Sequence, residues 1–391
     1  MSTNKKIPYG RQHISEEDIS MVIDALKHDY LTQGPKIAVF EEAFCDYIGC
    51  KYAVAVSNGT AALHLAALAL GVEKGDKVLC TPITFVASAN CIHYCGAEVD
   101  FVDADPRTGL MDLSALERKL RESPKGTYSG VVPVDLTGYP IDLEKVRKLA
   151  DEFGLWILED SCHAPGGGFV DSKGDLQKCG NGNYADLAIF SFHPVKHIAC
   201  GEGGMITTNS KELYEQLCIL RTHGITKDPE RLSRNEGGWY YEMIDLGYNY
   251  RLTDFQAALG ISQLKRAEEN LKIRKAIAER YDKELDHLTM EIVNPEEGVD
   301  HAYHLYTIKS ENRKELYDHL RAKGIMVQVH YIPVHAQPYY QSLGFAKGDY
   351  PNAEKYYSEC LSLPMYPTLT NEEQTYVIEQ VKEFEKTLQK I

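Results

Sequence analysis

Between residues 50 and 210, short apolar runs alternate with stretches of helical periodicity. The run 52–56 predicts a strand, and the alanine- and leucine-rich stretch 60–70 predicts a helix after it. Further apolar runs, each predicting a strand, mostly leave room for a helix between them: 77–80, 98–102, 130–134, 156–158, 187–192 and 204–208. This alternation is typical of right-handed βαβ units, so we expect an α/β fold with a mainly parallel sheet buried on both faces.

The pattern changes beyond Asp254. The elements predicted there are a long helix, two strands and two shorter helices, at 255–285, 303–308, 326–330, 313–323 and from Asn371. This order suits a smaller α+β domain attached through the long helix. We therefore expect a large domain at 1–254 and a small domain at 255–391, which also suits a chain of 391 residues.

Composition and charge narrow the class of protein. The chain has 43% hydrophobic and 25% charged residues, as in ordinary globular proteins. Its net charge of −15 argues against a nucleic acid bound by a basic face but permits a local basic pocket for an anionic metabolite. The N-terminus has no apolar run of signal-peptide length, and no stretch reaches the run of about 18 apolar residues that a membrane span needs. We expect a soluble, cytoplasmic protein that binds no membrane.

The ten cysteines are scattered, and none forms a C-x-x-C pair. Cys91 and Cys95 would share a helix face and, with His93, suggest zinc, but no second ligand pair with finger-like spacing follows. We expect buried reduced thiols and no metal.

Lys196 lies in a short irregular segment between the predicted strands 187–192 and 204–208, next to a glycine cluster. A lysine traps carbonyl groups only when its pKa falls and its ammonium is held off bulk water, and such a segment is a suitable place. A surface lysine in a turn is the alternative, and it is the commoner one for a single lysine. His193 and His197, which flank it, are interpreted as local framework or substrate contacts.

Two strand ends carry further candidates. Residues 57–60 join a predicted strand to a helix start, where unpaired N–H groups suit a phosphate; an ordinary N-cap made by Thr60 or Asn58 is the alternative. Asp160 ends a buried strand, where a carboxylate points into the ligand crevice and can hold a heteroaromatic N–H⁺; an acid that caps a helix is the alternative. Residues 180–185 match G-x-G-x-x-A, but the segment 175–179 before them is polar and no helix is predicted after them, so we expect no dinucleotide site.

Six segments together resemble, in family order, the DegT/DnrJ/EryC1/StrS sugar aminotransferases. They are 57–60, 82–85, 159–163, 191–196, 201–204 and 247–254. The resemblance spans nearly the whole chain, from 31–35 to 363–367. It implies the type I fold of pyridoxal-phosphate-dependent transferases, with a seven-stranded sheet and a smaller C-terminal domain. It also implies pyridoxal 5′-phosphate as cofactor, with pyridoxamine phosphate as its intermediate form.

The resemblance implies roles around the cofactor. Lys196 would form the Schiff base with the cofactor aldehyde, Asp160 would keep the pyridinium nitrogen protonated, and Phe85 would stack on the ring. The phosphate would be held by the residues at the helix start and by a hydroxyl from the strand that precedes Lys196: Gly59, Thr60, Ala61 and Ser191.

Other matching positions imply contacts around the ring and the substrate. His163 would lie near the 3′-oxygen of the ring, and Asn249 would reach the cofactor phosphate of a neighbouring subunit, so we expect a homodimer with shared active sites. Four residues are expected to face the substrate: Arg221, His223, Tyr331 and His335.

The implied reaction moves an amino group from L-glutamate to C4 of a nucleotide-linked 4-keto-6-deoxy sugar. Segments 91–96, 191–196, 239–243 and 328–333 are similar to family members of pseudaminic acid biosynthesis, which implies a UDP-linked N-acetylated hexose. Residues 197–200, His-Ile-Ala-Cys, depart from the Pro-Ile-Thr-Thr expected there and leave the exact sugar open.

Three alternatives stay open. The enzyme could aminate C3 or C4 of another UDP- or dTDP-linked keto sugar. A pyridoxamine-phosphate-dependent dehydratase of the same fold would have histidine in place of Lys196. A non-catalytic sugar-nucleotide-binding regulator would not need Lys196, Asp160 and Thr60 together.

Overall fold

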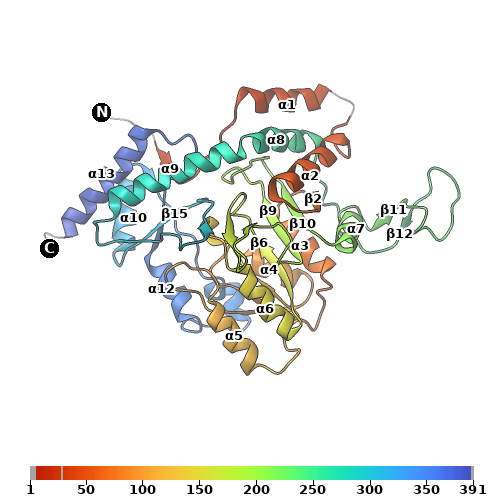
Figure 1. Cartoon of the computed structure of the whole chain (residues 1–391), viewed down its shortest axis with the longest axis horizontal. Helices are drawn as coiled ribbons and strands as arrows, with labels where there is room; N and C mark the ends of the chain where they lie inside the picture. Colours follow the sequence, from red (N-terminus) through yellow and green to blue (C-terminus); the bar gives the residue numbers. More distant parts are fainter. Residues whose placement is uncertain (1–5, 28–29, 389–391) are drawn as a thin grey trace.

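A seven-stranded sheet forms the centre of the structure, a computed structural model that describes residues 6–27 and 30–388 (Figure 1). The strand order is β2-β10-β9-β6-β5-β3-β4. The strands are β2 (Tyr52–Val56), β3 (Lys77–Cys80), β4 (Glu98–Phe101), β5 (Gly130–Val132), β6 (Trp156–Asp160), β9 (Leu187–Ser191) and β10 (Gly204–Thr208). Only β10 runs antiparallel to its neighbours in this sheet. The predicted mainly parallel, seven-stranded sheet is confirmed.

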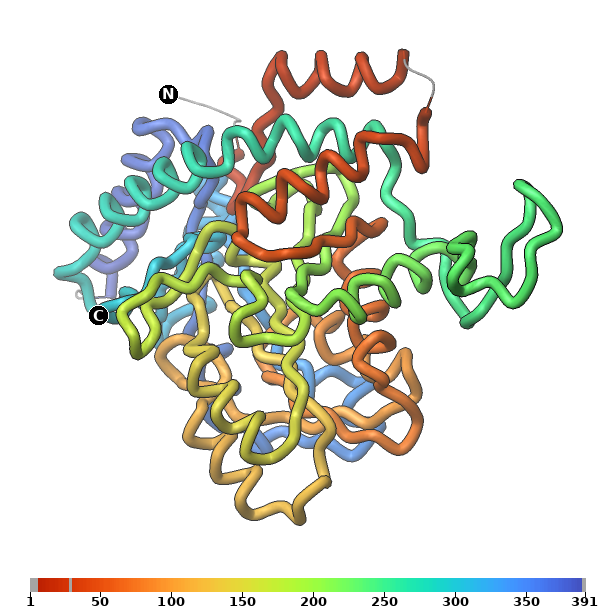
Figure 2. Tube along the Cα trace, turned by 45° about the vertical axis from the view of Figure 1, so that its right-hand side comes forward, coloured from red at the N-terminus to blue at the C-terminus, as the bar shows by residue number. Residues whose placement is uncertain are grey.

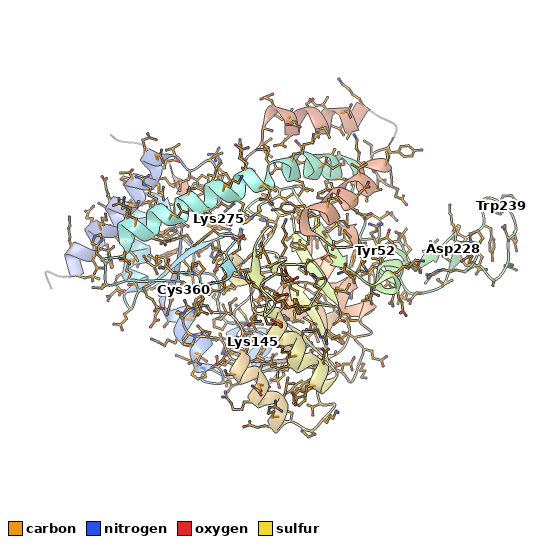
Figure 3. All side chains as sticks on the ribbon, viewed as in Figure 1. Tyr52, Lys145, Asp228, Trp239, Lys275 and Cys360 are labelled. Carbon is orange, nitrogen blue, oxygen red and sulfur yellow. The ribbon has the colours of Figure 1, made fainter. Side chains whose placement is uncertain are left out.

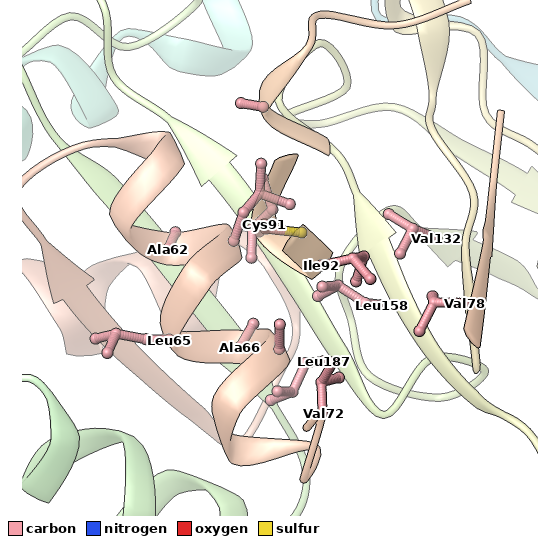
Figure 4. Packing of buried hydrophobic residues seen from close by; sticks show 14 of the residues in the cluster. Ala62, Leu65, Ala66, Val72, Val78, Cys91, Ile92, Val132, Leu158 and Leu187 are labelled. Atoms are coloured by element: carbon pink, nitrogen blue, oxygen red, sulfur yellow. The ribbon is translucent and has the colours of Figure 1, made fainter. Parts of the chain in front are cut away.

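Helices cover both faces of the sheet. The helices of this part are α2 (Pro35–Ile48), α3 (Gly59–Ala69), α4 (Ala87–Tyr94), α5 (Leu113–Glu122), α6 (Leu143–Phe153) and α7 (Lys211–Leu220). One face packs against α3 and α4, and Figure 4 shows the small side chain of Ala66 beside Leu187 of the sheet. The opposite face packs against α5 and α6 in one part and against α2 in another.

The predicted helix at 255–285 is interrupted. The structure has two helices there, α8 (Asp254–Lys265) and α9 (Ala267–Leu285), and Arg266 between them has non-helical dihedral angles. Its guanidinium lies 2.5 Å from the buried carboxylate of Asp18 in α1 (Glu16–Lys27). This long-range ion pair fixes Arg266 at the break, and the local sequence pattern does not reveal it.

A smaller antiparallel sheet, β13-β15-β17, lies in the C-terminal part. Its strands and the helices that follow in sequence are β13 (Glu291–Ile292), β15 (Tyr306–Lys309), β17 (Cys360–Leu363), α10 (Arg313–Ala322), α11 (Pro338–Ser342), α12 (Pro351–Glu359) and α13 (Asn371–Leu388). The predicted strand 326–330 is reduced to β16 (Ile325–Met326), which pairs with β1 (Ile7–Pro8). Ile7 thereby packs in the core of the C-terminal part, although its position in the sequence placed it in the large domain.

Short elements connect these two parts. They are η1 (Leu136–Gly138), β7 (Gly168–Val170), β8 (Leu176–Lys178), β14 (Val299–Asp300) and η2 (Val334–Ala336). β14 comes after the two long helices in the chain but pairs with β7, which follows β6. The division at 254/255 stays a prediction, and residues of η1 make hydrogen bonds across it to Ala302 and Leu305.

An arm extends from the body beyond α7 (Figure 2). Its two short strands are β11 (Ile225–Thr226) and β12 (Glu242–Met243). Figure 3 shows Trp239 at the outer end of the arm, where 73% of its surface is exposed. Met243 and Leu246 are exposed as well, so the arm presents large apolar side chains to its surroundings.

Among residues 6–27 and 30–388, the helices do not combine the length and apolar character that crossing a bilayer requires.

Candidate functional site

A cavity of about 730 Å³ lies at the edge of the sheet where β2, β6 and β9 end. These strands run in the same direction, so the residues that follow them meet there. Nine of the predicted site residues line the cavity: Gly59, Thr60, Ala61, Phe85, Asp160, His163, Ser191, Lys196 and Tyr331. Residues that sequence reasoning missed line it too, among them Tyr9, Ser88, Tyr250, His304 and His330.

Lys196 lies on a tight turn after β9. Its backbone N–H donates to the carbonyl of His193 at 2.8 Å, which turns the chain so that the lysine side chain lines the cavity. Burial lowers the pKa of the Lys196 ammonium, and the Asp160 carboxylate acts against that shift. The side chain is half-buried, so a larger fraction of neutral amine is available than on an exposed lysine.

Asp160, the last residue of β6, is buried with 5% of its surface exposed. Its Oδ2 accepts a hydrogen bond from the Ser88 hydroxyl at 2.6 Å, and its Oδ1 accepts from the Cys162 amide at 3.2 Å. Ser88 Oγ in turn lies 2.7 Å from Thr84 Oγ1. These contacts hold a carboxylate in a dry part of the cavity, where it can pair with a cationic ring N–H.

The start of α3 shows which part of residues 57–60 caps the helix and which part is left to bind a phosphate. Asn58 is the N-cap, and its Oδ1 accepts from the Ala61 amide at 2.8 Å. The Ala61 N–H, expected at a phosphate, is therefore already engaged, which leaves the Gly59 and Thr60 amides without an intrahelical partner. A Cβ on Gly59 would lie 3.0 Å from Ser191 Cβ, so glycine lets the Ser191 hydroxyl come close to this helix end. Two free amides beside hydroxyl groups at a helix N-terminus are suited to bind an anion.

Phe85 and Tyr331, from different halves of the chain, both line the cavity. The ring centroids are 6.2 Å apart, and Phe85 has 58% of its surface exposed. A large apolar ring left exposed at a cavity is available to stack on a planar ligand.

Buried histidines surround Lys196. His163 and His304 have ring centroids 4.4 Å apart, and His197 lies 5.7 Å from His304. His330 Nδ1 lies 2.9 Å from Ser362 Oγ. Burial lowers the pKa of all four rings, so they are neutral at physiological pH. The sequence could not identify His304, because a histidine in an apolar run is usually part of the core.

The segment 197–200 lies behind Lys196. All four of its residues are buried, and Ile198 and Cys200 pack in the core beside α2 and α8. Within the described part of the chain they do not line the cavity. The residues that differ from the expected pattern can therefore affect the cavity only indirectly, through the contact of His197 with the cavity-lining His304.

Four predicted site residues lie outside the cavity in this chain. Arg221 lies 2.5 Å from Glu41 and donates to the Ala55 carbonyl at 2.8 Å, and the ring of buried His335 lies 3.1 Å from Glu354. These contacts occupy both side chains and give no support to a substrate role. His223 and Asn249 are exposed near the base of the arm.

Glu159, which precedes Asp160 in the sequence, forms a buried carboxyl pair with Asp135. Ser161 Oγ lies 2.8 Å from Asp135 Oδ2 and 2.7 Å from Glu159 Oε1. A hydroxyl has one proton, so only one of these contacts can be its donation, and the other requires a protonated carboxyl. Burial and the neighbouring Asp135 raise the pKa of Glu159, so the pair keeps one proton.

The same pair explains one structural cluster and one sequence pattern. With Cys179, the two carboxyl groups form a cluster of metal-ligand type, but both are hydrogen-bonded within the protein. The Gly180 amide donates to Glu159 at 3.0 Å, so the G-x-G-x-x-A run is a turn fixed to this pair.

The chain is similar to known proteins over almost its whole length. The model of the DegT/DnrJ/EryC1/StrS aminotransferase family matches residues 12–382. A UDP-4-amino-4,6-dideoxy-N-acetyl-beta-L-altrosamine transaminase from Campylobacter jejuni is 38% identical over 378 residues, 95% of each chain. The spore coat polysaccharide biosynthesis protein SpsC from Bacillus subtilis is 37% identical over 393 residues, 98% of each chain.

Solved structures agree with this match. The PLP-form and the PMP-form of Spr1654 from Streptococcus pneumoniae superpose with a TM-score of 0.89 each, at 29% and 30% identity. The superpositions cover 98% and 97% of this chain and 99% of Spr1654 in both cases. This chain therefore belongs to the pyridoxal-phosphate-dependent sugar aminotransferases of the DegT/DnrJ/EryC1/StrS family.

Proposed function

We propose that this enzyme transfers an amino group from L-glutamate to C4 of a nucleotide-linked 4-keto-6-deoxy sugar, for surface-glycan biosynthesis. The observation that carries the proposal is the shared cavity of Lys196, Asp160 and the start of α3. A half-buried amine, a buried carboxylate and an anion-binding helix end are the groups that a pyridoxal phosphate aminotransferase needs.

The described residues fit each part of the cofactor. Asp160 would pair with the ring N–H⁺, and Phe85 would stack on the ring face. The phosphate would be held by the Gly59 and Thr60 amides and by the hydroxyls of Thr60 and Ser191, all of which line the cavity. When bound, the cofactor supplies an electron sink for the substrate carbon that exchanges a proton.

Lys196 would serve as the catalytic base and acid. Because burial lowers its pKa, its amine can take a proton from the carbon of the amino donor and return a proton when the keto sugar is aminated. His163 would lie beside the 3′-oxygen of the ring, and Tyr331 would face the ligand. Lys196 also argues against a dehydratase, which would have histidine at this position.

The sugar is proposed from the relative in Campylobacter jejuni, whose name supports a UDP-linked, N-acetylated substrate. A second candidate, a keto sugar of another surface polysaccharide, is favoured by SpsC, which is 37% identical against 38% for the transaminase. The two candidates would then differ through the contact of His197 with the cavity-lining His304, because position 197 departs from the pseudaminic pattern but lies behind the cavity.

The working unit is proposed to be a homodimer in which each arm reaches the partner subunit. Trp239, Met243 and Leu246 support this, since apolar side chains so exposed on a projecting arm are typical of an interface. Asn249, exposed near the base of the arm, would contact the cofactor phosphate of the partner.

The proposal is tested with purified protein, L-glutamate, pyridoxal phosphate and a panel of UDP- and dTDP-linked keto sugars. Products are identified by mass and by NMR, which separates amination at C3 from amination at C4. We expect a 4-amino product from a UDP-linked N-acetylated 4-keto-6-deoxy hexose. Transfer only to dTDP-linked sugars would overturn the proposed substrate, and loss of water without amination would overturn the reaction.

A further inference from the structure

Two hydrogen bonds define the proton position on His163. The Thr137 amide donates to His163 Nδ1 at 3.2 Å, so Nδ1 has no proton. Burial lowers the pKa of the ring well below its ordinary value, so the ring is neutral and its single proton is on Nε2. Nε2 lies 3.2 Å from the Tyr331 hydroxyl, which must therefore accept this hydrogen bond.

His301, which lies behind His163, has its proton fixed in the same way. The Tyr303 amide donates to His301 Nδ1 at 2.7 Å, so the proton of the His301 ring is on Nε2. That nitrogen lies 3.3 Å from Thr137 Oγ1. Burial lowers the pKa of His301 to about 3, which keeps the ring neutral.

Thr137 is held in an unusual backbone conformation between the two rings. Its φ of 63° lies in the left-handed region, which a β-branched residue rarely adopts. The Leu305 amide donates to the Thr137 carbonyl at 3.0 Å, and the Ala302 amide donates to the Gly138 carbonyl at 2.7 Å. We call this contact between residues 136–138 and 301–305 the seam. It aims the Thr137 N–H at His163.

We propose that Thr137 and His301, which do not line the cavity, are positioning residues that fix the His163 proton on Nε2 and thereby direct the Tyr331 O–H toward an anionic oxygen of the bound ligand. The four hydrogen bonds form a series in which each donor points toward the cavity. Tyr303 donates to His301, and His301 donates to the Thr137 hydroxyl. The Thr137 amide donates to His163, and His163 donates to the Tyr331 hydroxyl.

Tyr331 is the last residue of this hydrogen-bond series, and its O–H is left free to donate. Its oxygen accepts from His163, so its own proton is free to point into the cavity that it lines. Burial raises the pKa of the phenol, so it keeps that proton. In the cofactor-bound enzyme the acceptor would be the 3′-oxygen of the ring, a step that rests on the proposed function.

The proton position is tested in the cofactor-free protein by ¹⁵N NMR of the histidine rings, with His163→Gln used to assign the signal. We expect one nitrogen of His163 to be protonated and the other to be a bare acceptor, with no change between about pH 6 and pH 8. Two interconverting tautomers, or a ring that gains a proton in this range, would overturn the proposal. This result does not depend on whether the protein is an aminotransferase.

The positioning role is tested by Thr137→Val and Thr137→Gly. Both lose the contact with His301, but glycine adopts the left-handed conformation without strain, so it keeps the amide aimed at His163 better than valine does. We expect the pH midpoint of the bound cofactor's visible absorbance to rise by about 0.5 to 1 unit in Thr137→Val and by less in Thr137→Gly, because a ring oxygen that loses a donor holds nearby protons more tightly. Equal midpoints in all three proteins would overturn the proposal. Absence of any visible absorbance in the wild type would instead refute the proposed function.

Discussion

Arg221 Nη1 lies 2.5 Å from Glu41 Oε1, and both side chains are largely buried between α2 and the end of α7. Breaking a buried pair by removing one partner leaves a charge without compensation. We expect Arg221→Met to lower the free energy of unfolding by about 3 kcal/mol with little effect on the KM for the sugar nucleotide. Urea unfolding and steady-state kinetics measure the two quantities. Arg118→Met, at an exposed arginine, is the control.

The double variant Arg221→Met with Glu41→Gln extends this test. Neutralising both partners removes the uncompensated charge, so we expect it to recover part of the lost stability. A large rise in KM with unchanged stability would contradict this structural role and restore the substrate role predicted from the sequence.

Lys196→Ala removes the only cavity-lining lysine among the described residues. Turnover is expected to fall by on the order of a thousandfold or more, because one proton transfer loses its base and the other its acid. The visible absorbance of lysine-bound pyridoxal phosphate should vanish, whereas pyridoxamine phosphate should still bind, since Asp160 and the start of α3 are unchanged. Absorbance spectra and equilibrium dialysis test this, with exposed Lys125→Ala as control. Persisting turnover would disprove the assignment of Lys196.

The proton shared by Asp135 and Glu159 makes stability depend on pH. An unfolded carboxyl releases its proton near pH 4, whereas the native pair keeps one to higher pH, so native protein binds more protons in this window. The free energy of unfolding should therefore fall as pH rises above about 4, by at most about 1.4 kcal/mol per unit.

Glu159→Gln should remove most of that slope, because a neutral amide replaces the protonated carboxyl. Urea midpoints at pH 5 and pH 8 measure it, and Glu122→Gln, at an exposed acid, should leave the slope unchanged. Parallel pH profiles for wild type and Glu159→Gln would show that the pair holds no proton.

Subunit mixing tests whether the active sites are shared. Lys196→Ala and Asn249→Ala homodimers should each be nearly inactive if Asn249 serves the partner's cofactor. Denaturing and refolding the two together should restore about a quarter of wild-type activity, since half the dimers are mixed and each has one intact site. No recovery, in mixtures that size-exclusion chromatography shows to be dimeric, would place Asn249 in its own subunit's site.

Sequence reasoning could predict which residues the structure brings together where they follow strand ends. Asp160 and Ser191 end buried apolar strands, and the direction of parallel strands brings them to one edge without knowledge of the packing. The roles at residues 57–60 needed the structure, because Asn58 and Thr60 can both cap a helix and only the bond from Ala61 to Asn58 decides between them.

Sequence reasoning could not predict roles that depend on a partner far away in the sequence. The substrate role expected for Arg221 could not be weighed against Glu41, which is 180 positions earlier in the chain. The break at Arg266 depends on Asp18 in the same way. His304 and His330 lie in or beside apolar segments, where a ligand-facing histidine and a core histidine have the same local pattern.

The seam also limits how ligands can enter and leave. The bonds from Ala302 to Gly138 and from Leu305 to Thr137 join the two halves of the chain directly behind His163, and β14 pairs with β7 beside them. A hinge motion that parted the halves there would have to break all of these contacts. We therefore expect ligands to enter and leave on the side of the cavity where Phe85 is exposed, and not by separation of the two halves.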